Sequence, residues 1–335
     1  MPRRVSTPAW FFSLPFLACI SSSSALAAAP LERITIAHST VAGSQVIVQV
    51  MKDHGIFERN GLDVQVLFIV GGPTVVKSLL TGDVQAVVTA GAAPVLANLG
   101  GGDTVTVVGL LHTLDHSIIG RPGIARPEDL RGKILGVNGI GSADDNGLRF
   151  ALRRWGIDPE RELQVLALGG QPNRYKALQA GQIDATTVLP PLTGQARDAG
   201  YPLIAALADL GLEYQGTCMV TTRSTIRARE EAIRRLVKAF VEGVHFMKTH
   251  RAETTKSIGT FMKLQDPKAL GEAYDQYNRL IPRAPYPTAA GVRTILEDLA
   301  PKNPKARAAK PEDFIDPRFV KELDDTGHIR RLYGQ

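Results

Sequence analysis

The sequence has little cysteine. Two cysteines, Cys19 and Cys218, occur in 335 residues, and they form neither a CxxC redox motif nor the paired spacing of a zinc site. A disulfide framework and a cysteine-based metal site are therefore not indicated. If Cys19 is lost in processing, Cys218 has no intramolecular partner, and we expect it to be a small buried residue.

Clusters of like charge and common catalytic motifs are missing as well. The 39 Lys and Arg and 33 Asp and Glu give a net charge of +6, but the basic residues are dispersed and form no stripe typical of nucleic-acid binding. The sequence has no HExxH and no GxSxG, so no zinc hydrolase or serine hydrolase is indicated. We expect no metal site, no cofactor, no nucleic-acid partner and no enzyme activity.

What is present is an ordinary globular composition. Hydrophobic residues make up 44% and charged residues 21%, and the mean hydropathy is −0.03. These values argue against general disorder and against a protein with several membrane spans. The length suggests about two domains, on a prior of roughly 100–200 residues each.

The first thirty residues have the order of a secretory signal peptide. Two arginines at positions 3 and 4 precede an apolar run over 9–20, and an A-x-A pattern ends at Ala27. The run is about twelve residues long, short of the roughly 20 needed to span a membrane. We predict export, with a signal peptide at 1–27 or cleavage after position 29. A loose lipobox at 16–19 leaves lipid attachment at Cys19 open.

The remaining chain resembles itself at an offset of about 99 residues, which is the length of a duplicated lobe rather than of a solenoid repeat. The clearest matches are Gln65-Val66-Leu67 with Gln164-Val165-Leu166, and Gly82-Asp83-Val84 with Gly181-Gln182-Ile183. Upstream, 34–44 parallels 134–142, which pairs Ser44 with Ser142.

Each copy predicts the order strand, helix, strand, helix, strand. The predicted strands are 34–36, 64–69, 84–88, 134–137, 165–168 and 183–188, and the helices between them are 46–54, 74–80, 143–155 and 173–180. Further helices are predicted at 229–250, 252–262, 267–278 and 289–299. Alternating strands and helices with short loops indicate an α/β protein with mostly parallel sheets flanked by helices.

Parallel sheets bind ligands beyond the carboxyl ends of their strands, where helix N-termini offer free N–H groups. The loops expected there are rich in Gly, Ser, Thr, Asn and Pro. The candidate ligand-binding residues in and near them are Ser39, Thr40, Ser44, Thr89, Gly91, Ala92, His112, Gly141, Ser142, Arg174, Leu189 and Pro190.

Several of these candidates allow two interpretations. Ser44 and Ser142 stand where a helix N-cap is expected, so each either caps a helix or contacts a ligand. Arg174 either faces solvent or binds a carboxylate or sulfonate. Asp144 and Asp145 either complement the dipole of the predicted helix or face the ligand, where they would disfavour an anion.

Four segments together resemble one protein family: 55–64 (GIFERNGLDV), 80–84 (LTGDV), 127–133 (PEDLRGK) and 180–185 (AGQIDA). From about Leu31 to the helix at 229–250, the chain resembles ABC-transporter solute-binding proteins of the nitrate, sulfonate and taurine type, relatives of the thiamine-precursor proteins. The resemblance implies a two-lobed periplasmic-binding-protein fold of type II with additional C-terminal helices. Lobe 1 would comprise 31–113 and 217–335, and lobe 2 would comprise 114–216, with crossovers near 111–117 and 214–219.

The resemblance also implies a function. The protein would be periplasmic and monomeric, would capture a small anionic organic solute such as a sulfonate, a carboxylate or nitrate between its lobes, and would deliver it to an ABC permease and its ATPase. Two alternatives stay open, an exported ligand sensor with a signalling partner and an enzyme of this fold. Related pyrimidine synthases share the fold but use a Cys-rich motif that this sequence lacks.

Overall fold

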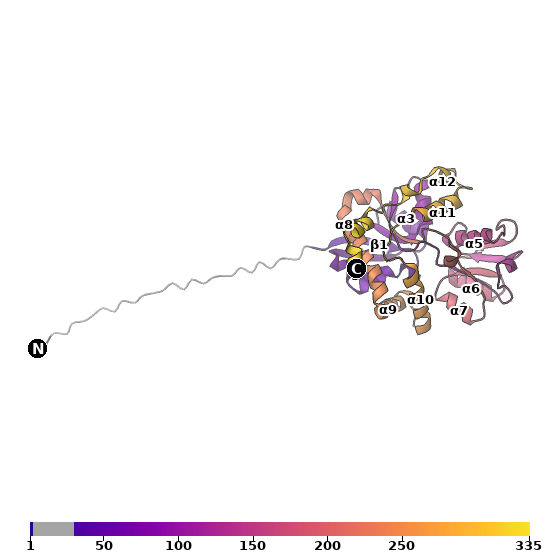
Figure 1. The fold of residues 1–335 in the computed structure, drawn as a ribbon, viewed down its shortest axis with the longest axis horizontal. Coiled ribbons are helices and arrows are strands. Elements are labelled where there is room, and N and C mark those ends of the chain that lie inside the picture. Colours follow the sequence, from indigo (N-terminus) through magenta and orange to yellow (C-terminus); the bar gives the residue numbers. More distant parts are fainter. Residues whose placement is uncertain (3–29) are drawn as a thin grey trace. The chain divides into compact units, whose positions relative to one another are not determined.

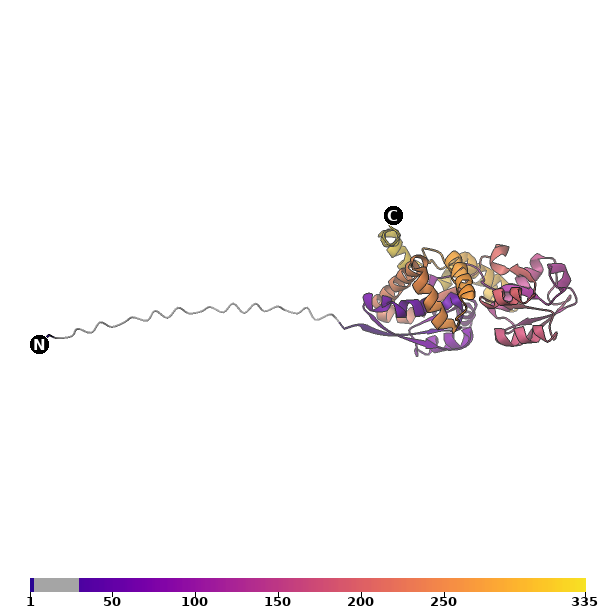
Figure 2. The same cartoon turned by 90° about the horizontal axis from the view of Figure 1, so that it is seen from below.

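The computed structural model describes residues 1–2 and 30–335. The chain divides into two units, Met1–Pro30 and Leu31–Gln335, and both sheets and the helices that the structure describes belong to the second unit (Figures 1 and 2). The predicted signal peptide, its cleavage site and Cys19 lie outside the described residues. Within the described part of the chain, no helix combines the length and the apolar character needed to cross a membrane.

The first sheet, sheet A, has five strands in the order β2-β1-β3-β10-β4. They are β1 Glu32–His38, β2 Leu62–Phe68, β3 Ala86–Ala90, β4 Thr104–Gly109 and β10 Thr217–Thr222. Strand β10 runs antiparallel to both of its neighbours, and β1, β2 and β3 are parallel. Every residue of β10 is buried, as expected for a central strand with helices on both faces.

The second sheet, sheet B, repeats this pattern in the order β7-β6-β8-β5-β9. Its strands are β5 Ser117–Gly120, β6 Ile134–Val137, β7 Gln164–Ala167, β8 Ala185–Val188 and β9 Leu203–Ala206. Here β5 is the antiparallel strand. The chain passes between the sheets over 110–116 and 207–216. Two mostly parallel five-stranded sheets flanked by helices are the two-lobed α/β fold that the sequence predicts.

The strand registers confirm the internal repeat. Thr35 pairs with Gln65 in sheet A, and Ile134 pairs with Gln164 in sheet B, at one and the same offset. The offset continues through the loops after β1 and β6, so Ser39 corresponds to Asn138 and Gly43 corresponds to Ser142. The match of Ser44 with Ser142 is therefore wrong by one residue.

Seven helices follow strands of the repeat: α1 Ile47–Asp53, α2 Ile56–Arg59, α3 Gly72–Leu80 and α4 Ala92–Leu99 with sheet A, and α5 Ala143–Arg154, α6 Gln171–Gln179 and α7 Leu192–Asp198 with sheet B. The predicted helix 46–54 is preceded by a 3-10 turn, η1 Gly43–Gln45. Gly55, which separates α1 from α2, has a φ of +62°, a conformation that glycine adopts without strain.

The C-terminal third is helical, with α8 Arg223–Thr249, α9 Arg251–Met262, α10 Pro267–Leu280, α11 Ala289–Leu299, α12 Pro304–Ala308, α13 Arg318–Asp325 and α14 His328–Leu332. The backbone of α8 leaves helical geometry at Arg229, with φ −144° and ψ 44°, close to where the sequence predicts a helix to begin. Asp266 caps α10 by accepting the N–H of Ala269, and Thr288 caps α11 by accepting the N–H of Gly291.

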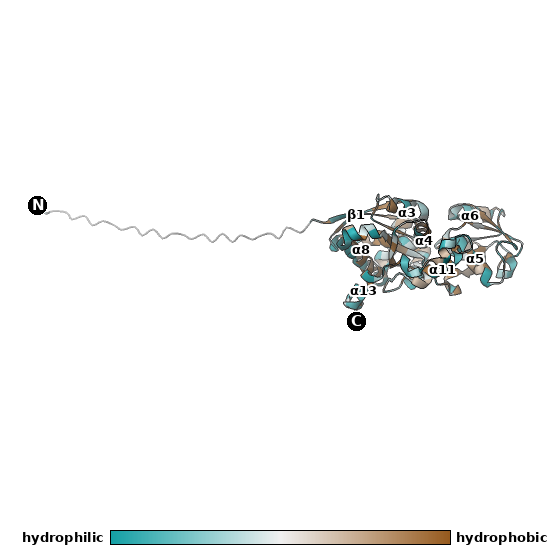
Figure 3. Ribbon diagram, turned by 90° about the horizontal axis from the view of Figure 1, so that it is seen from above, coloured by the Kyte–Doolittle hydropathy of each residue, from teal (hydrophilic) through white to brown (hydrophobic). Residues whose placement is uncertain are grey.

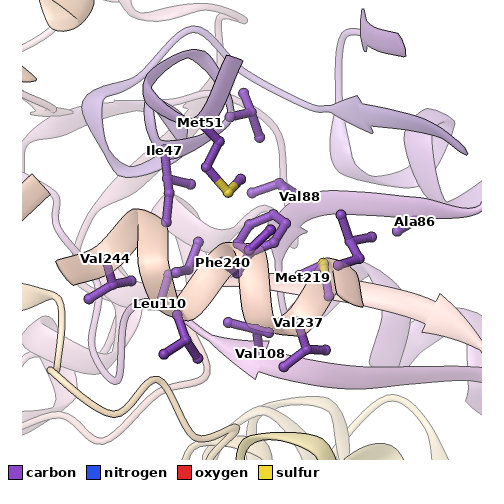
Figure 4. Close-up of a cluster of buried hydrophobic side chains, with 14 of the residues drawn as sticks. Ile47, Met51, Ala86, Val88, Val108, Leu110, Met219, Val237, Phe240 and Val244 are labelled. Atoms are coloured by element: carbon purple, nitrogen blue, oxygen red, sulfur yellow. The ribbon is translucent and has the colours of Figure 1, made fainter. Parts of the chain in front are cut away.

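Helix α8 supplies one face of the largest hydrophobic cluster. Phe240 lies in a group of buried side chains from α1, sheet A and α8 itself, among them Met51, Val88 and Met219 (Figure 4). The three- and four-residue spacing of the apolar positions in α8 therefore reflects packing against sheet A. The strands are largely coloured as hydrophobic and the outer helix α13 as hydrophilic in Figure 3.

Helix α11 packs differently. Its Val292 and Ile295 belong to one buried cluster with Leu148 and Leu152 of α5, and also with Val95 of α4. The C-terminal segment thus packs against elements of both sheets. The resemblance implies that the C-terminal helices return to the first lobe; α11 packs there against α4 and in addition packs against α5.

Candidate ligand-binding site

The predicted ligand-binding residues lie at the carboxyl ends of strands in both sheets. In sheet A, Ser39 and Thr40 follow β1, Thr89 is near the end of β3, and Gly91 and Ala92 lead from β3 into α4. In sheet B, Gly141 and Ser142 lie between β6 and α5, Arg174 is in the first turns of α6, and Leu189 and Pro190 follow β8. Each lobe therefore gathers its candidates at one edge of its sheet.

A glutamine that the sequence analysis missed organises the loop after β1. The buried Gln45 accepts the N–H of Ser39 at 2.9 Å and that of Thr40 at 3.2 Å through its side-chain oxygen, and its amide donates to the Ser39 hydroxyl at 3.1 Å. Ser44 lies inside the 3-10 turn, is buried and is not an N-cap. The loop geometry is thus set by Gln45 rather than by a serine cap.

Asp144 does in lobe 2 what Gln45 does in lobe 1. It accepts the N–H of Asn138 at 2.9 Å and the hydroxyl of Thr187 at 2.9 Å, and the Ser142 hydroxyl also donates to it. Ser142 stands at the N-cap position of α5 but makes no side-chain cap. The capping interpretation of both serines is therefore wrong.

The neighbouring Asp145 binds the same loop. Its carboxylate accepts the N–H of Gly141 at 2.7 Å and the Nε–H of Arg149 at 2.7 Å. Both aspartates lie in the first turn of α5, as the helix-dipole interpretation requires, and both are buried. In addition, each holds a loop amide, a role that the sequence did not reveal.

Arg174 is buried, so the solvent-facing interpretation is wrong. With 3% of its surface exposed, its guanidinium donates to the carbonyl of Gly169 at 2.6 Å and to the carbonyl of Thr187 at 3.0 Å. Its Nη2 lies 3.5 Å from a carboxylate oxygen of Asp144. The guanidinium therefore points into the interior of lobe 2, where its charge is paired with that of Asp144.

Electrostatics around this pair favours its ionised form. Burial acts to raise the pKa of Asp144, but the opposing effects of His116, Arg174 and the hydrogen bonds from Ser142 and Asn138 hold the pKa below its usual value. Burial lowers the pKa of Arg174, and Asp144 acts in the opposite direction. Because a guanidinium in a protein does not lose its proton near neutral pH, Arg174 stays charged.

The first crossing between the sheets connects the two edges. Tyr277 of α10 donates its hydroxyl hydrogen to Asp115 at 3.3 Å, and the Nδ1 of His116 lies 3.5 Å from Asp115. A Cβ atom at Gly43 would lie 2.0 Å from the Tyr277 ring, so only glycine fits there. Burial, followed by the effect of Asp115, raises the pKa of Tyr277 well above its usual value, and the hydroxyl keeps its proton.

The remaining candidates have simpler surroundings. The Thr89 hydroxyl is buried without a hydrogen-bond partner in the structure. The N–H of Gly91 donates to the carbonyls of Gln215 and Gly216, the Nε2 of His112 lies 2.7 Å from the carbonyl of Tyr286, and the N–H of Leu189 donates to the side chain of Gln171 at 2.6 Å. Pro190 precedes a cis peptide bond to Pro191.

A polar face of α10, which we call the α10 stripe, meets lobe 2. Lys268 pairs with Asp198, Glu272 pairs with Arg197 at 3.1 Å, the Gln276 amide donates to the carbonyl of Asp115 at 3.2 Å, and Arg279 lies 3.4 Å from Asp209. The partners come from α7 and from both crossings. The α10 stripe therefore links the helical C-terminal third to lobe 2.

The site offers little reactive chemistry. Among residues 1–2 and 30–335, no three His, Cys, Asp or Glu side chains are arranged to hold a metal ion. Cys218 is fully buried, as the sequence predicts, and burial raises the pKa of its thiol to about 12. Such a thiol is not a nucleophile at neutral pH, because the thiolate is the reactive form.

Comparison with protein sequences identifies a family and several relatives of this chain. A family model described as NMT1/THI5 like matches residues 45–254. A protein of Brucella abortus named only as a binding protein is 25% identical over 222 residues, which cover 65% of this chain and 68% of that protein.

Comparison with solved structures identifies the fold. The alkanesulfonate-binding protein SsuA from Xanthomonas axonopodis pv. citri, solved bound to MOPS, has a TM-score of 0.69 and 18% identity, covering 87% of this chain and all of that one. The periplasmic aliphatic sulphonate binding protein SsuA from Escherichia coli has a TM-score of 0.68 and 19% identity, covering 84% and 98%. The desulfurization enzyme DSZB, with a TM-score of 0.66, 15% identity and coverage of 88% and 99%, has the same fold. The fold of this chain is thus that of periplasmic binding proteins.

Proposed function

Because the chain belongs to the NMT1/THI5-like family, we propose that it is the extracytoplasmic solute-binding component of an ABC importer. The observation that carries the proposal is the pairing of two equivalent loops, one at the carboxyl edge of each sheet, each held in shape by a buried side chain, Gln45 in one and Asp144 in the other. Such edges are where open α/β sheets bind small molecules. The proposed location is the periplasm, after removal of residues 1–27.

The proposed mechanism is closure of two lobes around the solute. Lobe 1 would consist of 31–113 and 217–335, and lobe 2 of 114–216. The two crossings would act as hinges, and the solute would lie between the loops after β1 and β3 and those after β6 and β8. A solute that binds both lobes stabilises the closed arrangement by its differential affinity for that state. The closed protein would then deliver the solute to a permease and its ATPase.

The decisive experiment combines binding, shape and delivery. A metabolite library is screened against the purified protein by thermal shift, and a hit is titrated by calorimetry; a solute at 100 times its dissociation constant stabilises the fold by roughly 2.7 kcal/mol. X-ray scattering should then show a smaller radius of gyration with solute. The loaded protein should stimulate the ATPase of the permease complex that it serves. An unchanged radius at saturation contradicts closure, and an unresponsive ATPase contradicts delivery.

An enzyme is the second candidate, because DSZB shares the fold. The chemistry of the described residues supports binding instead, since the thiol of Cys218 is buried and protonated. Incubation of any hit with the pure protein, followed by mass spectrometry of the recovered solute, separates the two candidates. Recovery of unaltered solute favours binding, and conversion of the solute at a rate dependent on protein concentration favours an enzyme.

A further inference from the structure

The two sheet edges have an unusual charge inventory. In sheet A, the segments that follow β1, β2 and β3 (39–51, 69–76 and 91–102) contain no Asp, Glu, Lys or Arg. His38, at the end of β1, is buried, and burial lowers the pKa of its imidazole, which is therefore neutral at pH 7. The loops after β1, β2 and β3 thus offer a solute polar and apolar groups but no charged side chain. The carboxyl group at this edge is that of Asp115, which follows β4 and accepts the Tyr277 hydroxyl hydrogen.

The sheet B edge has charges, but they are paired. Arg174, in α6, is the single Lys or Arg among the first eight residues after β6, β7 and β8 (138–145, 168–175 and 189–196), and it faces Asp144. Asp145 faces Arg149 of α5. An anionic solute at this edge would meet two carboxylates and no unpaired cation of these loops.

Backbone amides of the loops before η1 and α5 are also in use. In the loop before α5, the N–H groups of Asn138 and Gly141 donate to Asp144 and Asp145. In the equivalent loop of lobe 1, the N–H groups of Ser39 and Thr40 donate to Gln45. These four loop amides are therefore satisfied by the protein's own side chains and are not free to bind an anion.

Both edges expose apolar side chains instead. Val41 is 42% exposed and Ile140 is 57% exposed, and the repeat register makes them equivalent residues of the two loops. Phe68, at the end of β2, is 51% exposed, and Val70 follows it. Exposed apolar side chains at the same position of both lobes are typical of surfaces that a ligand covers.

We infer that the solute is an uncharged molecule with an apolar face, not an anion. The inference rests on the proposed function and names the class of solute for that site. The apolar face would cover Val41 and Ile140, and a polar group of the solute would bind the Thr89 hydroxyl, which is buried near the end of β3 and has no partner in the structure. A site of this kind is a mostly apolar pocket with few polar contacts.

The test uses pairs of compounds that match in shape and differ in charge: nicotinamide and nicotinate, benzamide and benzoate, butanesulfonamide and butanesulfonate, alongside a general metabolite library. We expect the uncharged member to raise the melting temperature more and to bind at least tenfold more tightly by calorimetry. Tighter binding of the anion in any responsive pair, or anions as the best library hits, would overturn the inference and leave solute binding intact. A library without any hit contradicts the proposed function, and the inference falls with it.

Variants of exposed residues in lobe 2 locate the contact. Ile140→Glu should weaken binding of the best uncharged hit at least tenfold, because it removes apolar contact and adds a charge. The matched control is Leu203→Glu, at the opposite end of sheet B and 41% exposed, which should change affinity less than twofold. Ile140→Lys should weaken binding as Ile140→Glu does. If Ile140→Lys strengthens binding while Ile140→Glu weakens it, the solute is an anion and the inference is wrong.

Discussion

The two lobes fold the same backbone with different side-chain chemistry. The loop after the first strand is held by Gln45 in lobe 1 and by Asp144 in lobe 2. At the opposite end of the sheets, Gln85 accepts the N–H of Thr35 at 2.9 Å, and its counterpart Asp184 accepts that of Ile134 at 2.9 Å. At both positions, lobe 1 has a neutral glutamine amide where lobe 2 has an aspartate carboxylate.

The carboxylates of lobe 2 come with arginines. Asp184 pairs with Arg121 at 2.6 Å, and Asp144 lies beside Arg174. In lobe 1 the positions of Arg174 and Thr187 are occupied by the buried Val75 and Val88. An amide can therefore hold a loop among apolar neighbours, whereas a buried carboxylate requires a counter-charge, because an unpaired buried charge is costly.

The largest expected effect comes from removing that counter-charge. Arg174→Val introduces the residue that lobe 1 has at the equivalent position, Val75. It leaves Asp144 buried without the arginine and should lower the free energy of unfolding by about 3–5 kcal/mol. Urea denaturation monitored by circular dichroism measures the loss. The matched control is Val75→Ala in lobe 1, a truncation that involves no charge.

The double variant Asp144→Gln/Arg174→Val converts the edge of lobe 2 to the chemistry of lobe 1. We expect it to recover at least half of the stability lost by Arg174→Val, because the buried charge disappears with the arginine. If the double variant loses as much unfolding free energy as the two single variants lose together, the result contradicts the view that either a neutral amide or a carboxylate paired with arginine can hold this loop.

Asp298 tests the rule that a buried carboxylate requires a nearby cation, at a position where the nearest arginine is more distant. This residue of α11 faces α5, with Arg153 3.9 Å away, and burial, together with Glu297 and Asp145, raises its pKa to about 6. Since the unfolded value is near 3.8, the ionisation of Asp298 destabilises the fold progressively as the pH rises from about 4 to 6, and the full cost is present above pH 6. Asp298→Asn should stabilise the protein by about 2–3 kcal/mol at pH 7.5. The gain should vanish near pH 4, and a gain that is the same at both pH values would contradict this account.

Exchanging the residues at equivalent positions of the two loops should cost more stability in lobe 1 than in lobe 2. Gly43→Ser places a side chain against the Tyr277 ring and should cost about 2 kcal/mol, as overpacking in a core does. The reverse exchange in lobe 2, Ser142→Gly, removes a part-buried hydroxyl that makes no helix cap and should cost less than about 1 kcal/mol. Thermal unfolding of both variants checks the order, and equal losses would show that Gly43 is not constrained by Tyr277.

The smallest expected effect concerns the α10 stripe. Glu272→Gln breaks a partly exposed ion pair with Arg197 and should change unfolding free energy by less than about 1 kcal/mol. Because the pair joins α10 to lobe 2, we expect a change in solute affinity of about threefold or less, which disappears in 0.5 M salt. Glu231→Gln, which breaks a pair inside α8, is the control and should leave affinity unchanged.

The sequence predicted most parallel strands and helices of the repeat, because alternation and helical periodicity are local signals. It did not predict β4, β5, β9 and β10. Strand β5 is four residues long, and the antiparallel positions of β5 and β10 depend on pairing with strands far away in the chain. Such pairing leaves no local periodicity to detect.

The candidate site was located more accurately than it was interpreted. Strand ends placed Ser39, Thr89 and Ser142 at the sheet edges, but the inward direction of Arg174 depends on Asp144, thirty residues earlier in the chain. The repeat contained a signal for this contact. The second copy has Asp144 and Arg174, which are opposite in charge, where the first copy has the uncharged Gln45 and Val75. Opposite charges gained together at two positions predict contact.

The order in which the strands are synthesised differs between the sheets, and this constrains how the protein can assemble. All five strands of sheet B are available once residues 117–206 have left the ribosome. Its antiparallel strand β5 is synthesised first and pairs with β8 and β9 when these have been synthesised. In sheet A the central strand β10 comes last, and β3 and β4 have no common neighbour until it arrives. During synthesis from the N-terminus, sheet B of lobe 2 can therefore form before sheet A of lobe 1 has all its strands. Sheet A is completed only by contacts between residues that are far apart in the sequence.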